Sequence, residues 1–174
     1  MGLGKVIISE KSIKKRIKYL CKEIQLTNVS QSDPLHVIII LKGGAFFASD
    51  ILISLNRKTT LGFIESASYG NKTSSSGNIK LKISNMGNIK DKHILLIDDI
   101  LDTGQTLEAT KKKIFEYHPK TIKTCVLLDK PSRRIVDCHA DHVGFTIKNF
   151  FVVGYGLDFN NKYRHLRDIY TFTP

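Results

Sequence analysis

The stretch HILLIDDILDTGQTL, residues 93–107, joins an apolar run to a cluster of acids. Its first part, Ile94 to Ile97, has the apolar and β-branched character of a strand that is buried on both faces of a sheet. Asp98 and Asp99 follow at once, and Asp102 comes three residues later, before Thr-Gly-Gln-Thr. Because like charges repel and buried charges are costly, three acids at the end of a buried strand indicate a functional site.

The acid cluster, Asp98, Asp99 and Asp102, allows two geometries. On a helix, Asp98 and Asp102 would share one face at positions i and i+4, as in the DDxxD pattern of the all-helical prenyl-diphosphate synthases. In a strand–turn–helix unit the acids would instead lie on the loop, and residues 103–106 would open the next helix. We favour the second geometry, because the cluster follows a strand-like run and Gly104 suits a tight turn.

The same alternation of strand and helix runs along the chain. Apolar residues at three- and four-residue spacing predict helices, and short apolar, β-branched runs predict strands. The predicted helices are residues 9–25, with Ser9 as N-cap, 45–55 and 106–117, and the predicted strands are 36–41, 60–69, 79–83, 93–97, 121–128, 142–147 and 150–153. This order predicts an α/β fold with a mostly parallel sheet, in which ligands bind at the carboxyl ends of the strands.

The loop after the 93–97 strand combines an anion site with carboxylates. Main-chain N–H groups at the start of a helix suit a phosphate, and here they belong to Thr103, Gly104, Gln105 and Thr106. The neighbouring carboxylates suit sugar hydroxyls, a hard cation such as Mg²⁺, or a developing positive charge. Together these groups predict a pocket for a ribose 5-phosphate. The alternative is a polar turn whose only role is to cap the helix.

The composition fits one globular domain over residues 1–174. Hydrophobic residues make up 41% of the chain and charged residues 25%, which argues against disorder. No apolar stretch approaches the ~18 residues of a membrane span, and the N-terminus lacks the apolar block of a signal peptide. Cys21, Cys125 and Cys138 show no CxxC spacing, so we expect reduced, buried thiols. We therefore expect a cytoplasmic protein with no membrane partner.

The net charge of +11 raises the local concentration of anions, whether phosphorylated small molecules or nucleic acid. The lysines scatter along the chain, and the runs at 14–16 and 111–113 fall in predicted helices, where such runs usually face water. For this reason we expect no nucleic-acid partner.

The acid loop resembles the phosphoribosyl-diphosphate signature of type I phosphoribosyltransferases, and the whole chain resembles their hypoxanthine-guanine branch. Five motifs stand in the family's order: LKGG at 41–44, SYG at 68–70, IDDILDTGQTL at 97–107, LLDKPSRR at 127–134 and FFVVGYGLD at 150–158. The resemblance implies the type I phosphoribosyltransferase fold, with a central, mostly parallel twisted sheet flanked by helices. It also implies a small hood, built from the N-terminal residues and about 130–174, and a flexible lid hairpin at about 68–80.

The resemblance implies roles for the acid loop. It implies that Asp98 and Asp99 hold ribose hydroxyls and Mg²⁺, that residues 103–106 bind the 5-phosphate, and that Asp102 is the catalytic acid–base at the purine N7. One residue departs from the family pattern, in which the first acid is commonly Glu. The shorter Asp98 can contact Mg²⁺ through water rather than reach the ribose directly.

Four residues are implied to form the purine site: Lys130, Phe151, Val152 and Asp158. From the residues alone, Lys130 before Pro131 fits either an exposed loop lysine or a donor to an exocyclic oxygen, and Phe151 fits either core or a ring that stacks on a base. The resemblance implies that Lys130 reads the purine O6, Phe151 stacks on the base and Val152 binds it through the backbone. It also implies that Asp158 lies beside them as a second metal ligand.

The pyrophosphate site and the lid are implied in the same way. The resemblance implies that Lys42 and Gly43 bind pyrophosphate through a backbone in which the Lys42–Gly43 bond can be cis, and that Arg164 contacts pyrophosphate as well. The polar stretch 70–78 fits an exposed hairpin tip or a lid on composition alone. The resemblance implies a lid that begins at Ser68 and Tyr69 and excludes water from the reaction.

The implied activity is purine salvage. A Mg²⁺-dependent transfer would move the 5-phosphoribosyl group of 5-phosphoribosyl diphosphate to N9 of hypoxanthine or guanine, giving IMP or GMP and pyrophosphate. The alternative is an RNA-binding regulator on the same fold, which the net charge would suit. The base-reading pair Lys130 and Phe151 argues against that alternative. The family also suggests a homodimer or homotetramer.

Overall fold

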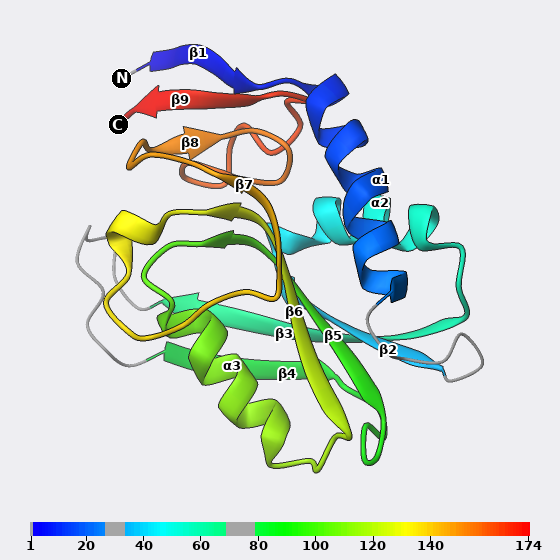
Figure 1. The fold of residues 1–174 in the computed structure, drawn as a ribbon. Helices are drawn as coiled ribbons and strands as arrows, with labels where there is room; N and C mark the ends of the chain where they lie inside the picture. Colours follow the sequence, from blue (N-terminus) through cyan, green and yellow to red (C-terminus); the bar gives the residue numbers. More distant parts are fainter. Residues whose placement is uncertain (1, 27–33, 69–78) are drawn as a thin grey trace.

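The computed structural model describes residues 2–26, 34–68 and 79–174, which form two sheets and three α-helices (Figure 1). In chain order the elements are β1 (Gly2–Ile8), α1 (Glu10–Leu26), β2 (Leu35–Leu41), α2 (Gly44–Leu55), β3 (Thr59–Ser68), β4 (Ile79–Asn85), β5 (His93–Leu101), α3 (Gln105–Phe115), β6 (Thr121–Asp129), the 3₁₀ helix η1 (Pro131–Arg133), β7 (His142–Thr146), β8 (Val152–Val153) and β9 (Ile169–Thr173). The predicted α/β fold with a central, mostly parallel sheet is confirmed.

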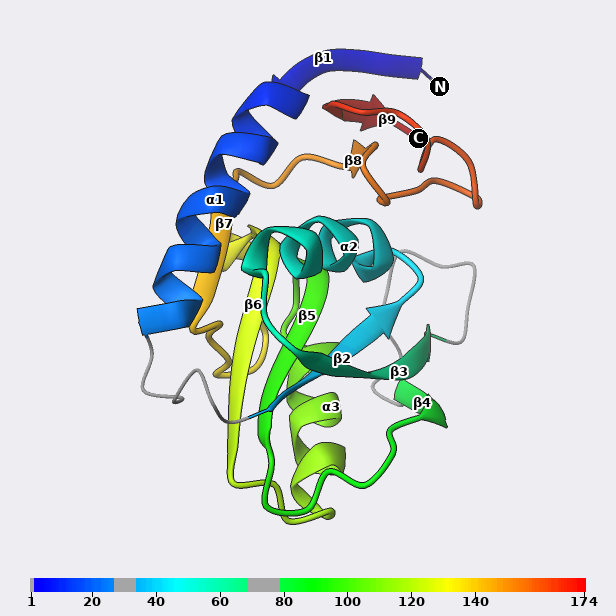
Figure 2. The same cartoon turned by 90° about the vertical axis from the view of Figure 1, so that its right-hand side faces the viewer.

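The large sheet has the strand order β4-β3-β2-β5-β6-β7, and all neighbours are parallel except β3 and β4. Its central strands are apolar along their length because both of their faces are covered. Helices α1 and α2 cover one face of the sheet and α3 covers the other (Figure 2). Side chains of α1 and α2 pack with Leu95 and Ile97, and side chains of α3 pack with Ile94 and Leu96. The topology therefore brings the carboxyl ends of β2, β3 and β5 to one edge of the sheet.

Helix α1 follows directly from the apolar periodicity of its sequence. Its buried residues recur at three- and four-residue steps, and they are Ile13, Ile17, Leu20, Cys21 and Ile24. The predicted cap is confirmed, since the Ser12 N–H donates to the Ser9 hydroxyl at 3.3 Å and the Ile13 N–H donates to the Ser9 carbonyl at 2.9 Å.

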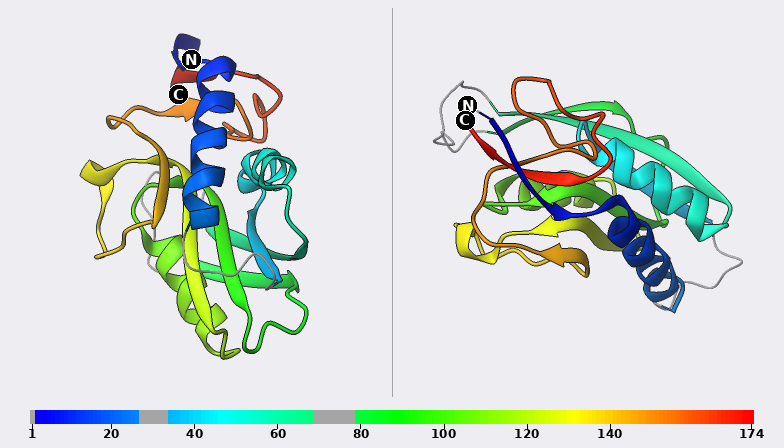
Figure 3. Two further views of the ribbon diagram at one scale, coloured as in Figure 1. Left: turned by 45° about the vertical axis from the view of Figure 1, so that its right-hand side comes forward. Right: turned by 90° about the horizontal axis from the view of Figure 1, so that it is seen from above.

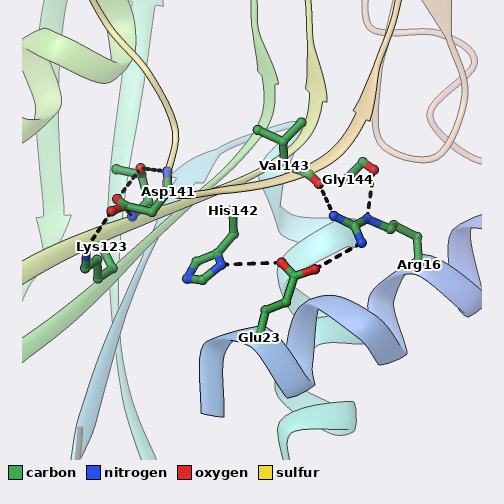
Figure 4. Close-up of polar contacts among 8 residues, drawn as sticks. Arg16, Glu23, Lys123, Asp141, His142, Val143 and Gly144 are labelled. Atoms are coloured by element: carbon green, nitrogen blue, oxygen red, sulfur yellow. Dashed lines mark hydrogen bonds and ion pairs between the residues drawn. The ribbon is translucent and has the colours of Figure 1, made fainter. Parts of the chain in front are cut away.

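The edge strand β7 is covered by side chains of α1 (Figure 4). Arg16 donates to the carbonyls of Val143 at 2.7 Å and Gly144 at 3.0 Å, and it pairs with Glu23 at 3.1 Å. Glu23 also lies 3.7 Å from the buried ring of His142. Because an uncovered edge strand can pair with another chain, these contacts satisfy polar groups that would otherwise be open to association.

The small sheet has the order β1-β9-β8, and it brings the two termini side by side (Figures 1 and 3). It shares the core of the large sheet through the buried residues Ile8, Val152 and Ile169. We did not predict β1 or β9 from the sequence, because β1 is almost fully exposed and shows no apolar alternation. Its pairing partner lies more than 160 residues away, as in the register Gly2↔Thr173.

No helix in the described part of the chain is both long enough and apolar enough to cross a membrane. The thiols of Cys21, Cys125 and Cys138 are free and buried.

Candidate active site

A pocket of about 530 Å³ opens where β2, β3 and β5 reach their carboxyl ends. It is lined by residues of five chain segments: Ile40 to Gly43, Glu65 and Ser66, Asp98 to Gly104, Thr106 and Leu107, and the group Asp158, Asn161 and Arg164. The pocket therefore gathers the predicted ribose, phosphate and pyrophosphate residues in one place, except Gln105, which is not part of its lining. Glu65 and Ser66 were not predicted, although their position near the end of a parallel strand could have indicated them.

The acid cluster differs in one respect from its predicted geometry. Asp98 and Asp99 lie within β5 rather than on the loop, because the pairing of β5 with β6 continues past them to Leu101↔Asp129. Only Asp102 lies on the loop. Asp98 is buried, and its Oδ1 atom accepts a hydrogen bond from the Asp99 N–H at 2.9 Å. The strand therefore fixes the first two acids, and the loop carries the third.

The electrostatics of the first two acids favour a bound proton or cation. Burial raises the pKa of Asp98 well above its usual value, and the neighbouring Asp99 carboxylate raises it further. Burial also raises the pKa of Asp99, while hydrogen bonds and the charge of Arg164 oppose that rise. Two adjacent carboxylates in this setting can hold a hard cation or accept hydrogen bonds from sugar hydroxyls.

The loop before α3 forms a cradle of main-chain amides. Gly104 has a φ of 87°, in the left-handed region that favours glycine, and α3 begins at Gln105. The Gln105 N–H approaches the Thr103 hydroxyl at 3.5 Å, and Thr106 lines the pocket. N–H groups in the first turn of a helix have no partner within the helix, so they can bind an anion in the pocket.

Arg134 holds this loop in place through its guanidinium group. Its guanidinium donates to the carbonyls of Leu101 and Asp102 and to the carboxylate of Asp129. It also packs beside Gly104, where a β-carbon would lie 2.9 Å from Arg134 Cδ. The arginine therefore ties the acid loop to the loop that follows β6. The sequence shows two adjacent arginines at 133 and 134 and offers no signal that distinguishes them.

Asp102, the predicted catalytic residue, is partly exposed and lines the pocket. Its carboxylate accepts a hydrogen bond from Arg133 Nε at 3.2 Å. A carboxylate with one exposed ion-pair partner can exchange that partner for a ligand at little cost.

The segment between β2 and α2 packs directly on the acids. A β-carbon at Gly43 would lie 1.6 Å from Asp99 Oδ2, so only glycine leaves room for the carboxylate. The predicted position of the cis peptide bond is wrong by one residue, since the cis bond lies at Leu41–Lys42 and not at Lys42–Gly43. Gly43 already has the helical φ of −62° and ψ of −41°, and the Ala45 N–H donates to the Lys42 carbonyl at 3.3 Å. The Lys42–Gly43 bond thus belongs to the first turn leading into α2.

Asp158 and Arg164, which also line the pocket, form an ion pair. Arg164 Nη2 lies 2.7 Å from Asp158 Oδ1, and Arg164 Nη1 donates to the Gly156 carbonyl at 2.5 Å. Gly156 in turn packs on the pyrophosphate segment, where its β-carbon would lie 2.6 Å from the Gly43 carbonyl. The structure therefore brings the predicted pyrophosphate residues Arg164 and Gly43 together through Gly156.

Of the four residues predicted for the purine site, Asp158 lines this pocket, whereas Lys130, Phe151 and Val152 do not belong to its described lining. Lys130 is buried beyond the end of β6, and its N–H donates to the Leu101 carbonyl at 3.0 Å. Burial lowers the pKa of Lys130, and the charge of Asp102 opposes that shift. Phe151 is 43% exposed, and Val152 is buried in β8.

The lid prediction falls mostly outside the described residues. Ser68 ends β3, and Tyr69 and the residues up to 78 are not among those that the structure describes. The lid therefore stays a prediction.

The acids fit a metal that the substrate helps to hold. In the three described ranges of the chain, no group of three or more His, Cys, Asp and Glu side chains is placed to hold a metal ion. Mg²⁺ is usually bound by one or two carboxylates together with waters and phosphates, rather than by a closed protein cage. Asp98 and Asp99, with Asp158 across the pocket, supply the hard oxygen donors that such an arrangement needs.

Comparisons with known proteins agree with this geometry. The family model described as a phosphoribosyl transferase domain matches residues 7–160. The chain is 41% identical over 166 residues to the hypoxanthine-guanine phosphoribosyltransferase of Aquifex aeolicus (strain VF5), covering 95% of this chain and 93% of that protein. It is 38% identical over 172 residues to the bifunctional protein TilS/HprT of Listeria monocytogenes serotype 4b (strain F2365), covering 99% of this chain and 26% of that longer protein.

A solved structure is similar over the whole length. The crystal structure of a hypoxanthine-guanine phosphoribosyltransferase from Bacillus anthracis superimposes with a TM-score of 0.90 and 38% sequence identity. The alignment covers 99% of this chain and 100% of that one.

Proposed function

Because the chain belongs to the phosphoribosyltransferase family and is an enzyme of that family, we propose that it transfers a 5-phosphoribosyl group to hypoxanthine or guanine. The donor would be 5-phosphoribosyl diphosphate, and the products would be IMP or GMP and pyrophosphate. One observation carries the proposal: the adjacent acids Asp98 and Asp99 share a pocket with the main-chain segment that opens α3. An anion cradle beside carboxylates is what a ribose 5-phosphate requires.

The donor would lie across the pocket. The main-chain N–H groups of residues 103–106 would bind the 5-phosphate, and Asp98 and Asp99 would accept hydrogen bonds from ribose hydroxyls. Arg164 and the backbone of Lys42 and Gly43 would orient the pyrophosphate on the opposite side. Mg²⁺ held by Asp98 and Asp99, and a second Mg²⁺ held by Asp158, would neutralise charge on the leaving pyrophosphate.

The base would approach from the side of Asp102. Lys130 would donate to the purine O6, Phe151 would stack on the ring and the Val152 backbone would hydrogen-bond to its edge. As the C1′–O bond to pyrophosphate breaks and the C1′–N9 bond forms, the purine gains positive charge and becomes more acidic. Asp102 would then take the proton from N7, a role that is typically worth ~10²–10⁴-fold in rate.

Steady-state kinetics test this proposal. Purified protein with 5-phosphoribosyl diphosphate, Mg²⁺ and hypoxanthine or guanine should form IMP or GMP, and chelation of Mg²⁺ should stop the reaction. Adenine is the matched control, because it lacks the O6 that Lys130 would read, and it should be a poor substrate. Absence of turnover with every 6-oxopurine, together with salt-dependent binding of RNA, would instead favour the regulatory alternative.

Location and assembly belong to the same proposal. We expect the enzyme to act in the cytoplasm, where its three free thiols would stay reduced. We also expect a homodimer or homotetramer.

A further inference from the structure

Four aromatic rings gather at the small sheet, and Phe172 of β9 lies at their centre. Its ring centroid is 4.9 Å from that of Phe159, 5.1 Å from that of Tyr163 and 6.0 Å from that of Phe151. Phe151 and Phe159 also meet edge to face, with centroids 5.7 Å apart and an interplanar angle of 88°. All four separations fall within the range in which aromatic pairs attract one another.

The backbone places Phe172 opposite Phe151. The Phe172 N–H donates to the Phe151 carbonyl at 2.8 Å, which continues the antiparallel pairing of β8 and β9 beyond Val152↔Thr171. The two residues are thus fixed by the sheet as well as by their rings. Phe172 is 6% exposed and Phe151 is 43% exposed, so one ring is enclosed and the other keeps an open surface.

A ring that is already held in place stacks on a ligand at a lower entropic cost. An exposed phenylalanine that is free to change rotamer must be ordered when it binds, whereas one packed against neighbouring rings has already lost that freedom. Phe159 and Phe172 both pack against Phe151 and leave part of its ring open.

We propose that Phe172 is a positioning residue for base binding, which acts by holding the Phe151 ring in the orientation that stacks on the purine. The inference rests on the proposed function, because it takes Phe151 as the stacking residue. Phe172 lies outside the five motifs that carry the family resemblance. The proposed role depends on its ring contacts with Phe151 and Phe159.

The first test is the substitution Phe172→Leu, assayed by steady-state kinetics. We expect the KM for hypoxanthine to rise about 3- to 10-fold, which corresponds to the loss of aromatic pairs of this kind. The KM for 5-phosphoribosyl diphosphate should rise less, and kcat at saturating base should stay within about twofold. An unchanged KM for hypoxanthine would overturn the inference, and so would an equal rise in both KM values.

Ile169→Val is the matched control for a general weakening of β9. Ile169 is fully buried in the same strand, and it packs in the aliphatic core. This small truncation should leave the KM for hypoxanthine unchanged. If it raises that KM as much as Phe172→Leu does, the effect comes from the strand, and the inference fails.

A fluorescence measurement separates this inference from the proposed function. The chain contains no tryptophan, so Phe151→Trp introduces a single reporter at the stacking position. Adding Phe172→Leu should make this tryptophan more accessible to acrylamide and lower its anisotropy without any ligand. Equal quenching with Phe and Leu at position 172 would show that the ring at 151 is not held by residue 172. If the wild-type protein forms no IMP, the proposed function is contradicted. The quenching experiment would still test whether Phe172 holds the ring at position 151.

Discussion

Gly43 and Asp99 occupy adjoining space, such that a β-carbon on the glycine would lie 1.6 Å from the Oδ2 atom of the aspartate. The backbone of Gly43 is in the ordinary right-handed helical region, so its conformation alone does not demand glycine. Glycine is required here because the Asp99 carboxylate occupies the space that a β-carbon would need. The pyrophosphate segment and the acid strand therefore depend on each other for their positions.

Gly43→Ala should displace the Asp99 carboxylate and cut activity without unfolding the protein. A shift of about 1 Å in a positioned group can cost ~10²-fold in rate, and we expect a loss of that order in kcat/KM. Gly2→Ala is the control, since a β-carbon there would meet no atom within 4 Å. Near-wild-type kinetics for Gly43→Ala would show that Asp99 does not need its present position.

Asp98→Asn should stabilise the protein at pH 7 while it impairs catalysis. Burial raises the pKa of Asp98 in the folded state, so the protonated carboxyl favours the folded protein. That stabilisation is lost as the pH rises through the raised pKa of the folded state. The amide of asparagine removes the cost of burying a charged carboxylate, and its oxygen can still accept the hydrogen bond from the Asp99 N–H. Thermal unfolding without divalent cations should show a Tm higher by about 2–4 °C, or ~1 kcal/mol.

The stability gain of Asp98→Asn should shrink as the pH approaches the ordinary aspartate pKa of about 4, where the wild-type carboxyl is also neutral. Asp102→Asn is the matched control, because Asp102 is partly exposed and paired with Arg133. It should not raise the Tm. A lower Tm for Asp98→Asn at pH 7 would mean that interactions of the Asp98 carboxylate in the folded protein fully offset the cost of burying it.

Asp102→Asn should lower kcat by ~10²–10⁴-fold, because an amide cannot take the N7 proton. Binding of IMP, measured by calorimetry, should change far less. Arg133→Met is the control, since it removes the ion-pair partner at 3.2 Å and leaves the acid in place. Equal losses in turnover and in nucleotide affinity would argue against an acid–base role.

Arg134→Met should destabilise the fold and loosen the acid loop. Its ion pair with Asp129 is mostly buried, with side-chain exposures of 14% and 16%. Removing one partner of such a pair leaves an uncompensated charge, which we expect to cost about 2–3 kcal/mol and to lower the Tm by roughly 5–10 °C. Arg133→Met, whose side chain is 42% exposed, should lower the Tm by less than about 2 °C. Similar Tm values for the two variants would mean that Arg134 does not hold the loop.

The elements with strong local patterns could be predicted from the sequence. Helix α1 begins directly after the predicted cap Ser9 and buries the predicted face, and β2, β5 and β6 contain the apolar runs that were expected. Strands β1 and β9 could not be predicted, because each is stabilised mainly by the other across the length of the chain. Local periodicity carries no information about such a partner.

The candidate site shows the same division. The acids and the amides of residues 103–106 could be predicted as one site because they adjoin each other in the sequence. The end of β5 was misplaced, because continued pairing with β6 draws the charged residues Asp98 and Asp99 into a strand. The role of Arg134 depends on carbonyls about 30 residues earlier in the chain, a relation that only the folded chain reveals.

A crystal structure of the protein with IMP tests the central claim most directly. The account predicts that the 5′-phosphate lies within about 2.7–3.2 Å of the main-chain nitrogens that open α3, between residues 103 and 106, with the ribose hydroxyls facing Asp98 and Asp99. A phosphate bound anywhere else, with those nitrogens left to solvent, would contradict it.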